Sequence, residues 1–259
     1  MTKKHYSILI YLLTTILVLT LSIFIYRIIT HISYVNVHDE VTVSKYTGQR
    51  IYNPGFDESL KIATYINTNK EGPLIGLSSA DVVLEFLSNS NGITYKAIFN
   101  PEAAKNISGM VNLKKYSNSY LPKFNFSNNI ETSAIKGKAA TNIFVSFYED
   151  LSSNFIYQDD EYYHYKGLLM DKDTTSPVKS TNVIVQYING NVTNEDTLNS
   201  SENNGSGLLF CNGRVQDIMW NKNEGSPIKI VDVHRNRITL MPGHTWWIFI
   251  DENCSVSYD

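Results

Sequence analysis

"GLSSADVVLEF", residues Gly76–Phe86, is a mostly apolar stretch that contains two acidic residues. Ser78 and Asp81 fit an S-x-x-D capping pattern, which favours the start of a helix. Such a helix has an apolar stripe made of Ala80, Val83, Leu84 and Leu87. Asp81 and Glu85 are then about one turn apart, so both carboxylates point to the same side. The stretch therefore predicts a capped helix with a pair of carboxylates on one face.

A predicted strand lies on each side of this helix. "IATYINT", Ile62–Thr68, and "ITYKAIFN", Ile93–Asn100, are rich in β-branched and aromatic residues. The turn-forming residues of "NKEGPLIG" and "NSNG" separate the two strands from the helix. This order is that of a β-α-β unit, which predicts a sheet with a helix packed on it. The stretch that follows, "PEAAKNISGMVNLKKYSNSY", has room for a short helix.

From Asn142 onward the sequence is typical of antiparallel β-structure. Segments such as "NIFVSFY", "TNVIVQYING" and "HTWWIFID" are β-branched and aromatic, with Asp, Asn and Gly turns between them. Asn212-Gly213 is a hairpin-turn signal, and Asn189–Gly207 is a long polar loop. "YQDDEYYHY", Tyr157–Tyr165, is interpreted as one strand with a solvated acidic face. The predicted fold class is therefore α+β, with a membrane helix, a small domain containing the β-α-β unit, and a mainly antiparallel β C-terminal domain.

"SILIYLLTTILVLTLSIFIY", Ser7–Tyr26, contains no charged residue and is long enough to cross a bilayer as a helix. A cleaved signal peptide is the alternative, but the run is longer than a usual signal core and no small-x-small cleavage site follows it. Lys3 and Lys4 precede the run, so the positive-inside rule places the N-terminus in the cytoplasm. We therefore expect a single-pass protein of the cell membrane with an extracytoplasmic C-terminal domain.

The predicted organisation has five parts. They are residues 1–32, the cytoplasmic tip and transmembrane anchor; 33–58, a stalk and lead-in; 59–124, an N-terminal α+β domain; 125–141, a linker; and 142–255, a C-terminal β domain. The part beyond the membrane helix is long enough for one large domain or two small ones.

The composition excludes several classes of function. The formal net charge is only -3, so nothing suggests nucleic-acid binding. The histidines and cysteines show no spacing of metal ligands, and no metal or other cofactor is expected. GxSxG, HExxH and P-loop motifs are absent from the sequence. Cys211 and Cys254 could form a disulfide in an oxidising compartment, and two free thiols are the alternative.

Several segments together resemble a known family. The N-terminal "IATYINTNKEGPLIGLSSADVVLEFLSNSNGITYKAIF" and the C-terminal "GSGLLFCNGRVQDIMWNK" and "LMPGHTWWIFI" are similar to the YerB-like lipoproteins of Gram-positive bacteria. That family is of unknown function and has distinct N- and C-terminal domains. The resemblance implies a divergent and shortened member, in which a transmembrane anchor replaces the lipidated cysteine.

The resemblance also implies a polar cluster that this chain keeps only in part. Asp81 and Glu85 match positions that are commonly acidic in the family. The family has Thr-Arg where this chain has Thr94 and Tyr95, and Lys115 is the basic residue left in a segment that otherwise carries arginines. The acids would hold an arginine or another cationic group of a ligand or partner. The alternative is structural, with Asp81 capping the helix and Glu85 facing solvent or pairing with a lysine.

The tryptophans offer a second candidate site. Trp220 and Trp247 could contribute to an aromatic face that binds sugar, although tryptophans in strands more often belong to the core. Alternation along the strand predicts that either Trp246 or Trp247 points outward.

Three functions are compatible with these features. The preferred one is a non-enzymatic membrane-anchored protein that binds an envelope protein or a cell-wall component. The first alternative is a cell-wall glycan or peptide hydrolase that uses Asp81 or Glu85, which requires a cleft with one acid projecting into it. The second is a module that binds a small ligand in a pocket between the two domains.

Overall fold

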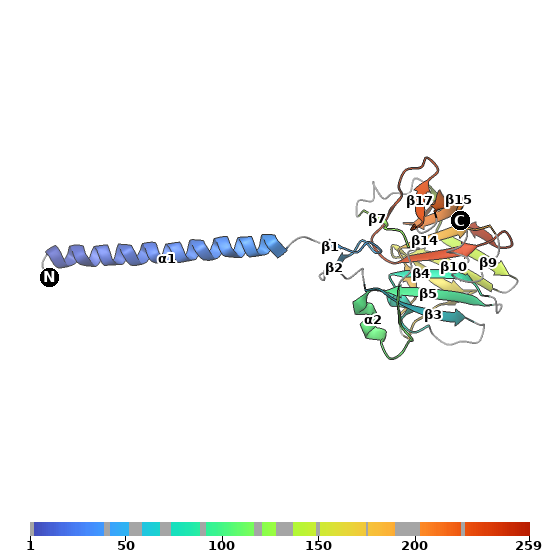
Figure 1. Ribbon diagram of the computed structural model, residues 1–259, viewed down its shortest axis with the longest axis horizontal. Helices are drawn as coiled ribbons and strands as arrows, with labels where there is room; N and C mark the ends of the chain where they lie inside the picture. Colours follow the sequence, from blue (N-terminus) through green and yellow to red (C-terminus); the bar gives the residue numbers. More distant parts are fainter. Residues whose placement is uncertain are drawn as a thin grey trace. The chain divides into compact units, whose positions relative to one another are not determined.

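The computed structural model describes residues 3–38, 42–51, 59–67, 74–88, 92–116, 121–127, 137–148, 151–174, 176–189, 203–223 and 226–259. The chain divides into two compact units, Met1–Thr42 and Val43–Asp259. Figure 1 shows the long helix of the first unit and the β-rich body of the second.

The first unit is the helix α1 (Lys3–His38), which confirms the predicted apolar helix. Its span Ile10–Thr30 is long and apolar enough to cross a membrane. Hydroxyl groups within the span donate to backbone carbonyls one turn earlier, as Ser22 does to Val18 at 2.8 Å. Such internal bonds satisfy polar groups where no water is present. Because α1 continues to His38, the first residues of the predicted stalk are helical.

The described residues of the body form two main sheets, and the larger one crosses both predicted domains. Its order is β17 (Lys229–Asp232), β16 (Arg214–Lys222), β15 (Asn203–Cys211), β14 (Asn182–Tyr187), β19 (Thr245–Ile250), β4 (Val82–Leu87), β5 (Ile93–Phe99), β3 (Lys61–Asn67) and β6 (Lys114–Lys115), and β8 (Lys138–Ala139) pairs with β16. The contacts of β19 with β14 and with β4 are parallel, and the other pairs are antiparallel. Strands of 59–124 and of 142–255 therefore lie in one sheet.

The smaller sheet is antiparallel throughout. Its order is β12 (Leu169–Met170), β11 (Glu161–Lys166), β10 (Leu151–Gln158), β9 (Asn142–Tyr148) and β20 (Ser255–Tyr258), and β13 (Lys179–Ser180) pairs with β11. Two short ladders join β1 (Thr42–Val43) to β2 (Arg50–Ile51) and β7 (Asn125–Phe126) to β18 (Thr239–Leu240). The expected short helix is α2 (Pro101–Ile107), which Asn100 caps by accepting from the Ala103 amide. The body is thus mostly β, in agreement with the predicted α+β class.

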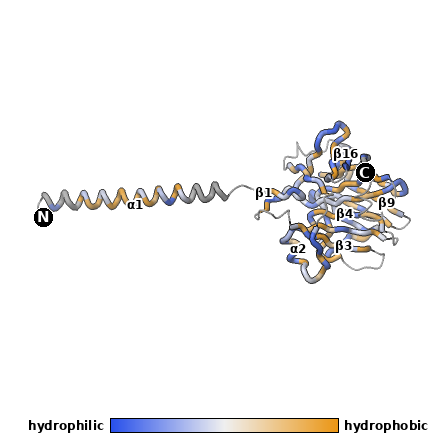
Figure 2. The backbone as a smooth tube through the Cα atoms, in the orientation of Figure 1, coloured by the Kyte–Doolittle hydropathy of each residue, from blue (hydrophilic) through white to orange (hydrophobic). Residues whose placement is uncertain are grey.

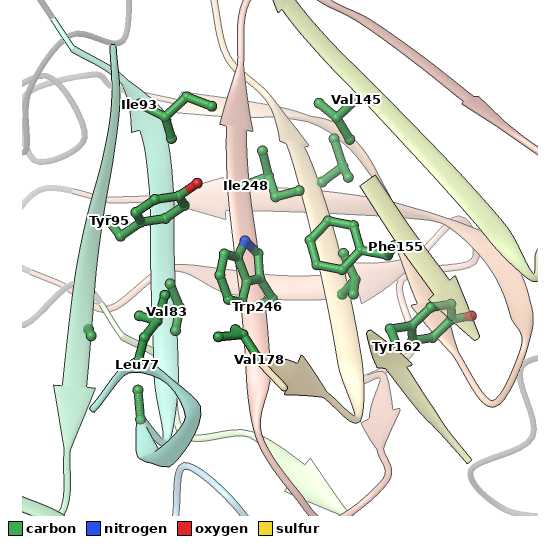
Figure 3. Close-up of a cluster of buried hydrophobic side chains, with 14 of the residues drawn as sticks. Leu77, Val83, Ile93, Tyr95, Val145, Phe155, Tyr162, Val178, Trp246 and Ile248 are labelled. Carbon is green, nitrogen blue, oxygen red and sulfur yellow. The ribbon is translucent and has the colours of Figure 1, made fainter. Parts of the chain in front are cut away.

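Two hydrophobic clusters lie on opposite sides of the larger sheet. The first lies between the sheets, where Tyr95, Val83 and Trp246 of the larger sheet meet Val145 and Phe155 of the smaller one (Figure 3). The second includes Leu84, Phe86, Ile184, Leu209, Trp220 and Trp247. Figure 2 shows the apolar residues along the strands of the body, with more hydrophilic residues in its loops. The central strands β14, β19 and β4 contribute to both clusters, so they are buried on both faces.

The prediction of a helix over Gly76–Phe86 is wrong. Leu77–Ser79 form a single 3-10 turn, η2, and Val82–Leu87 form the central strand β4 between β19 and β5. Because β4 is buried on both faces, apolar residues follow one another instead of alternating with polar ones. A short apolar run of this kind cannot be distinguished from a helix by its periodicity. Asp81 consequently caps no helix, and the unit is an antiparallel arrangement of three strands.

Some of the predicted strands and turns are confirmed and others are wrong. The flanking strands β3 and β5 are confirmed, and so is the Asn212-Gly213 turn, whose φ angles of 53° and 67° join β15 to β16. Tyr157–Tyr165 is not one strand: Asp159 and Asp160 adopt φ angles of 52° and 64° and form the turn between β10 and β11. In the predicted polar loop, 203–207 belong to β15, and 190–202 lie outside the described residues.

Phe86 distinguishes the observed strand from the predicted helix, because the helical stripe did not include it. Phe86→Ala is expected to lower the free energy of unfolding by about 3 to 5 kcal/mol, since its side chain fills the second cluster. Urea unfolding of the full chain in detergent micelles measures this change. Met110→Ala, at an exposed site, should stay within about 0.5 kcal/mol of the parent. A near-neutral Phe86→Ala variant would contradict the strand.

Candidate functional site

Asp81 lies immediately before β4 and connects neighbouring parts of the body. Asn100 Nδ2 donates to Asp81 Oδ1 at 2.9 Å. The Asp81 amide donates to the Ile98 carbonyl, and the Asp81 carbonyl accepts from the Thr245 amide. The residue is buried. Asp81 therefore joins β5, β19 and the start of α2 from a buried position.

Glu85 belongs to a buried row of hydrogen-bonded side chains, Glu85, Ser153, His164 and Asp171, which we call the inter-sheet polar chain. Ser153 Oγ on β10 donates to Glu85 Oε2 on β4 at 3.0 Å. The same hydroxyl oxygen lies 2.8 Å from His164 Nε2 on β11, and His164 Nδ1 lies 3.1 Å from Asp171 Oδ2. All four residues are buried. The inter-sheet polar chain therefore connects the larger sheet to the smaller one through the core.

The outer end of the inter-sheet polar chain is anchored by charge and by backbone bonds. Lys166 Nζ lies 3.4 Å from Asp171 Oδ1 and is partly exposed. The Asp171 amide donates to the His164 carbonyl at 2.9 Å. Two residues later, Asp173 accepts from the Gly76 amide and from Ser78 Oγ. The segment that carries both aspartates is therefore attached to the turn that precedes β4.

Aromatic rings enclose the inter-sheet polar chain. The Trp246 Nε1–H on β19 donates to Glu85 Oε2. The Trp246 indole also stacks on the His164 imidazole, with ring centroids 4.4 Å apart at an angle of 24°. Tyr95 and Phe155 contact the same imidazole from β5 and β10. These rings exclude water from the inter-sheet polar chain, and a dry surrounding strengthens the hydrogen bonds between its side chains.

The two carboxyl groups at the ends of the inter-sheet polar chain, Glu85 and Asp171, have pKa values shifted in opposite directions. Burial raises the pKa of Glu85, and the charge of His164 with the hydrogen bonds from Trp246 and Ser153 offsets this only in part. Burial also acts to raise the pKa of Asp171, but the hydrogen bond and the charge of His164, together with Lys166, lower it overall. Asp171 therefore ionises more readily than an ordinary aspartate, and Glu85 ionises less readily than an ordinary glutamate.

Ser153, His164 and Asp171 have the connectivity of a serine hydrolase triad. A reactive serine donates its hydroxyl proton to the histidine and leaves one side open to a substrate carbonyl. Here the Ser153 side chain has no exposed surface, so a substrate carbonyl cannot reach its hydroxyl group. The arrangement is a closed connection between the sheets and not an open reaction centre.

The structure brings only some of the predicted site residues together. Tyr95 is the cross-strand neighbour of Glu85, and Thr94 on the same strand is buried opposite Phe86. Lys115 is exposed on β6. The expectation that Glu85 faces solvent or pairs with a lysine is wrong, because its partners are Ser153 and Trp246.

The tryptophans are core residues. Trp220 Nε1 donates to the Tyr187 and Ser206 carbonyls, and Trp247 Nε1 donates to Gln186 Oε1. The expectation that Trp246 or Trp247 points outward is wrong, since both are buried. The reason is that β19 lies between β14 and β4 and is covered on both faces.

Cys211 and Cys254 are free thiols, so the disulfide considered for them is not formed. Burial raises the pKa of each thiol to about 11, which keeps both protonated at neutral pH. Among the described residues, no group of three or more His, Cys, Asp or Glu side chains could hold a metal ion.

A groove of about 480 Å³ lies on the smaller sheet, and we call it the outer groove. Its lining comes from all four neighbouring strands and the turn after β11: Asn142, Ile143, Phe144, Asn154, Phe155, Ile156, Tyr165, Gly167, Leu168, Ser257, Tyr258 and Asp259. Phe144, Ile156 and Leu168 are 46%, 39% and 96% exposed. Exposed apolar side chains gathered around a concavity are typical of a binding surface. The groove is built within 142–259 and not between the two predicted domains.

Comparison with known protein families finds a match for the C-terminal part of the chain. Residues 143–247 match the C-terminal domain of a protein family of unknown function, DUF3048. This region contains Ser153, His164, Asp171 and Trp246, whereas Glu85 lies outside it. This region is therefore similar to a domain of unknown function, which agrees with the resemblance found in the sequence.

A solved structure shows the same fold. It is the crystal structure of the YerB protein from Bacillus subtilis, which matches with a TM-score of 0.60 at 18% sequence identity. The match covers 83% of this chain and 99% of the YerB chain. No curated protein matches the sequence.

Sequence reasoning missed Ser153, Asp171 and the role of His164. The three residues come from separate strands and a loop, so no local spacing connects them. One signal was available: Glu85 interrupts an otherwise apolar run, and a charge at such a position requires a buried partner. His164 among tyrosines was the matching signal on β11.

Asp171→Ala is expected to lower the free energy of unfolding by about 3 kcal/mol at neutral pH, because it leaves His164 without its acceptor. The pKa of Asp171 is lowered, so its stabilisation is present above its unfolded pKa and disappears as the pH falls through its folded pKa. Urea unfolding at several pH values measures both effects. Asp217→Ala, at an exposed position on β16, is the control and should be close to neutral. Equal effects of the two substitutions would refute the assignment.

Proposed function

We propose that this chain is a single-pass membrane protein whose β-rich body binds an envelope protein or a cell-wall component on the extracytoplasmic side without chemical turnover. The observation that carries the proposal is the outer groove, where apolar side chains are exposed around a concavity. A soluble body seldom keeps such a surface unless something binds there. The inter-sheet polar chain, by contrast, is closed to substrates.

Support for the membrane anchor comes from α1. Its span Ile10–Thr30 has the length and hydropathy of a transmembrane helix. Lys3 and Lys4 lie before the span, which favours a cytoplasmic N-terminus. The body would then face the cell envelope, where wall polymers and envelope proteins are available as partners.

The two alternatives have less support. A hydrolase that uses Asp81 or Glu85 needs a carboxyl group in reach of a substrate, and both side chains are buried and hydrogen-bonded. A small ligand remains an alternative occupant of the outer groove. A thermal-shift screen detects such a ligand, because binding to the folded form raises the melting temperature.

Replacement of Leu17 and Leu19 by Arg together tests the anchor. Two charges at the centre of the span cost about 5 to 7 kcal/mol of insertion free energy, so the variant should leave the membrane fraction. Alkaline extraction of membranes, followed by immunodetection of the chain, measures the distribution. The control replaces both residues by Ile and should stay in the membrane. Extraction of the parent chain by alkali would rule out the anchor.

Ile156→Asp tests the outer groove, with Met219→Asp as the matched control. Both parent residues are apolar and 39% exposed, but Met219 lies on β16 of the larger sheet. Partners are cross-linked to the full chain in detergent-solubilised membranes and quantified for each variant. We expect Ile156→Asp to reduce capture at least about tenfold, which corresponds to about 1.4 kcal/mol, and Met219→Asp to leave it unchanged. Undiminished capture by a folded Ile156→Asp variant would contradict the proposal.

A further inference from the structure

We infer that Glu85, Ser153 and His164 share a single proton across the interface between the two sheets, and that the sheets pack most firmly in the pH range in which this proton is kept. The three side chains come from β4, β10 and β11 and have no exposed surface. Ser153 Oγ lies 3.0 Å from Glu85 Oε2 and 2.8 Å from His164 Nε2. A hydroxyl group has one proton to donate, so it can donate to only one of these neighbours at a time.

Two arrangements satisfy every contact with the same number of protons. In the first, Glu85 is ionised and accepts from Ser153, and His164 is an imidazolium that donates to Ser153 Oγ. In the second, Glu85 is protonated and donates to Ser153 Oγ, and the Ser153 hydroxyl donates to neutral His164. In both arrangements His164 Nδ1–H donates to Asp171. Two proton transfers, from Glu85 to Ser153 and from Ser153 to His164, convert one into the other without a change of total charge.

If Glu85, Ser153 and His164 gain or lose one proton, their donors and acceptors can no longer all be paired. With a second proton, Glu85 is neutral while His164 is cationic, and one donor has no acceptor. That donor can sit on Glu85 Oε1, which has no hydrogen-bond partner among the described residues. With no shared proton, ionised Glu85 and neutral His164 both require the only Ser153 proton. Each change leaves a buried polar atom unsatisfied, which weakens the packing.

The groups that surround Glu85, Ser153 and His164 carry no unbalanced charge that would hold the shared proton on one side. Lys166 on β11 and Asp171 beyond β12 face each other at 3.4 Å, so their charges offset. Tyr95 on β5 and Trp246 on β19 close the remaining sides, with rings 6.2 Å and 4.4 Å from the imidazole. Phe155 covers it from β10.

The titration of the two carboxyl groups agrees in sign with a stability maximum. Burial raises the pKa of Glu85, so its contribution is present at low pH and disappears as the pH rises through its folded pKa. The pKa of Asp171 is lowered, so its contribution disappears as the pH falls through its folded pKa. The stability contributed by the inter-sheet polar chain therefore decreases on both sides of an intermediate pH range.

The first test follows His164 in the full chain in detergent micelles. Ring nitrogens of 15N-labelled histidine are observed by NMR between about pH 4 and pH 9, and His164→Gln identifies the signal. We expect the Nε2 signal of His164 to differ between the parent protein and Glu85→Gln, because the variant keeps the side-chain shape but cannot exchange a proton with His164 through Ser153. The same Nε2 signal in both proteins across the whole pH range would overturn the inference.

The second test uses stability and does not depend on the histidine signals. Urea unfolding across the same pH range should give the parent protein a maximum, with the ratio of folded to unfolded chain falling at least about tenfold toward alkaline pH. Ser153→Ala removes the group that transmits the proton and should flatten the profile, while Ser152→Ala, at its half-buried neighbour on β10, should keep it. A profile of unchanged shape in Ser153→Ala would also overturn the inference, and the NMR test applies if this variant does not fold.

Discussion

The carboxyl group of Glu85 lies in the hydrophobic core between two β-sheets, and its hydrogen bonds constrain how those sheets can pack. An unpaired carboxyl at this depth would be strongly unfavourable. Ser153 from β10 and Trp246 from β19 supply its donors, and His164 and Asp171 extend the connection to the edge of the smaller sheet. The position of β10 and β11 above β4 is thereby fixed by directional bonds as well as by apolar contacts.

This constraint relates the two parts of the sequence to each other. Glu85 lies in the N-terminal part, and its partners all lie in the region that matches the DUF3048 C-terminal domain. The larger sheet continues across the same boundary, through the parallel contact of β4 with β19. The outer groove lies on the opposite face of the smaller sheet, so the polar chain supports the sheet that carries it. Binding at the groove and packing at the core are therefore expected to influence each other.

The sequence predicted the apolar helix, most strands after Asn142 and the Asn212-Gly213 turn, because each has a local pattern. It did not predict β4, since a strand buried on both faces resembles a short helix in its composition. It identified Glu85 and Tyr95 as candidate site residues, but the partners it considered for Glu85 were a cationic ligand group, solvent or a lysine. The partners Ser153 and His164 come from separate strands of another sheet, and only the tertiary fold brings them to Glu85.

A double-mutant cycle with Glu85→Gln and His164→Gln measures the central interaction most directly. The two residues lie on different sheets and are connected through Ser153. If the inter-sheet polar chain couples them, their effects on the free energy of unfolding at neutral pH should deviate from additivity by about 1 to 2 kcal/mol. Effects that add within about 0.3 kcal/mol would show that the two side chains act independently, and would contradict this account.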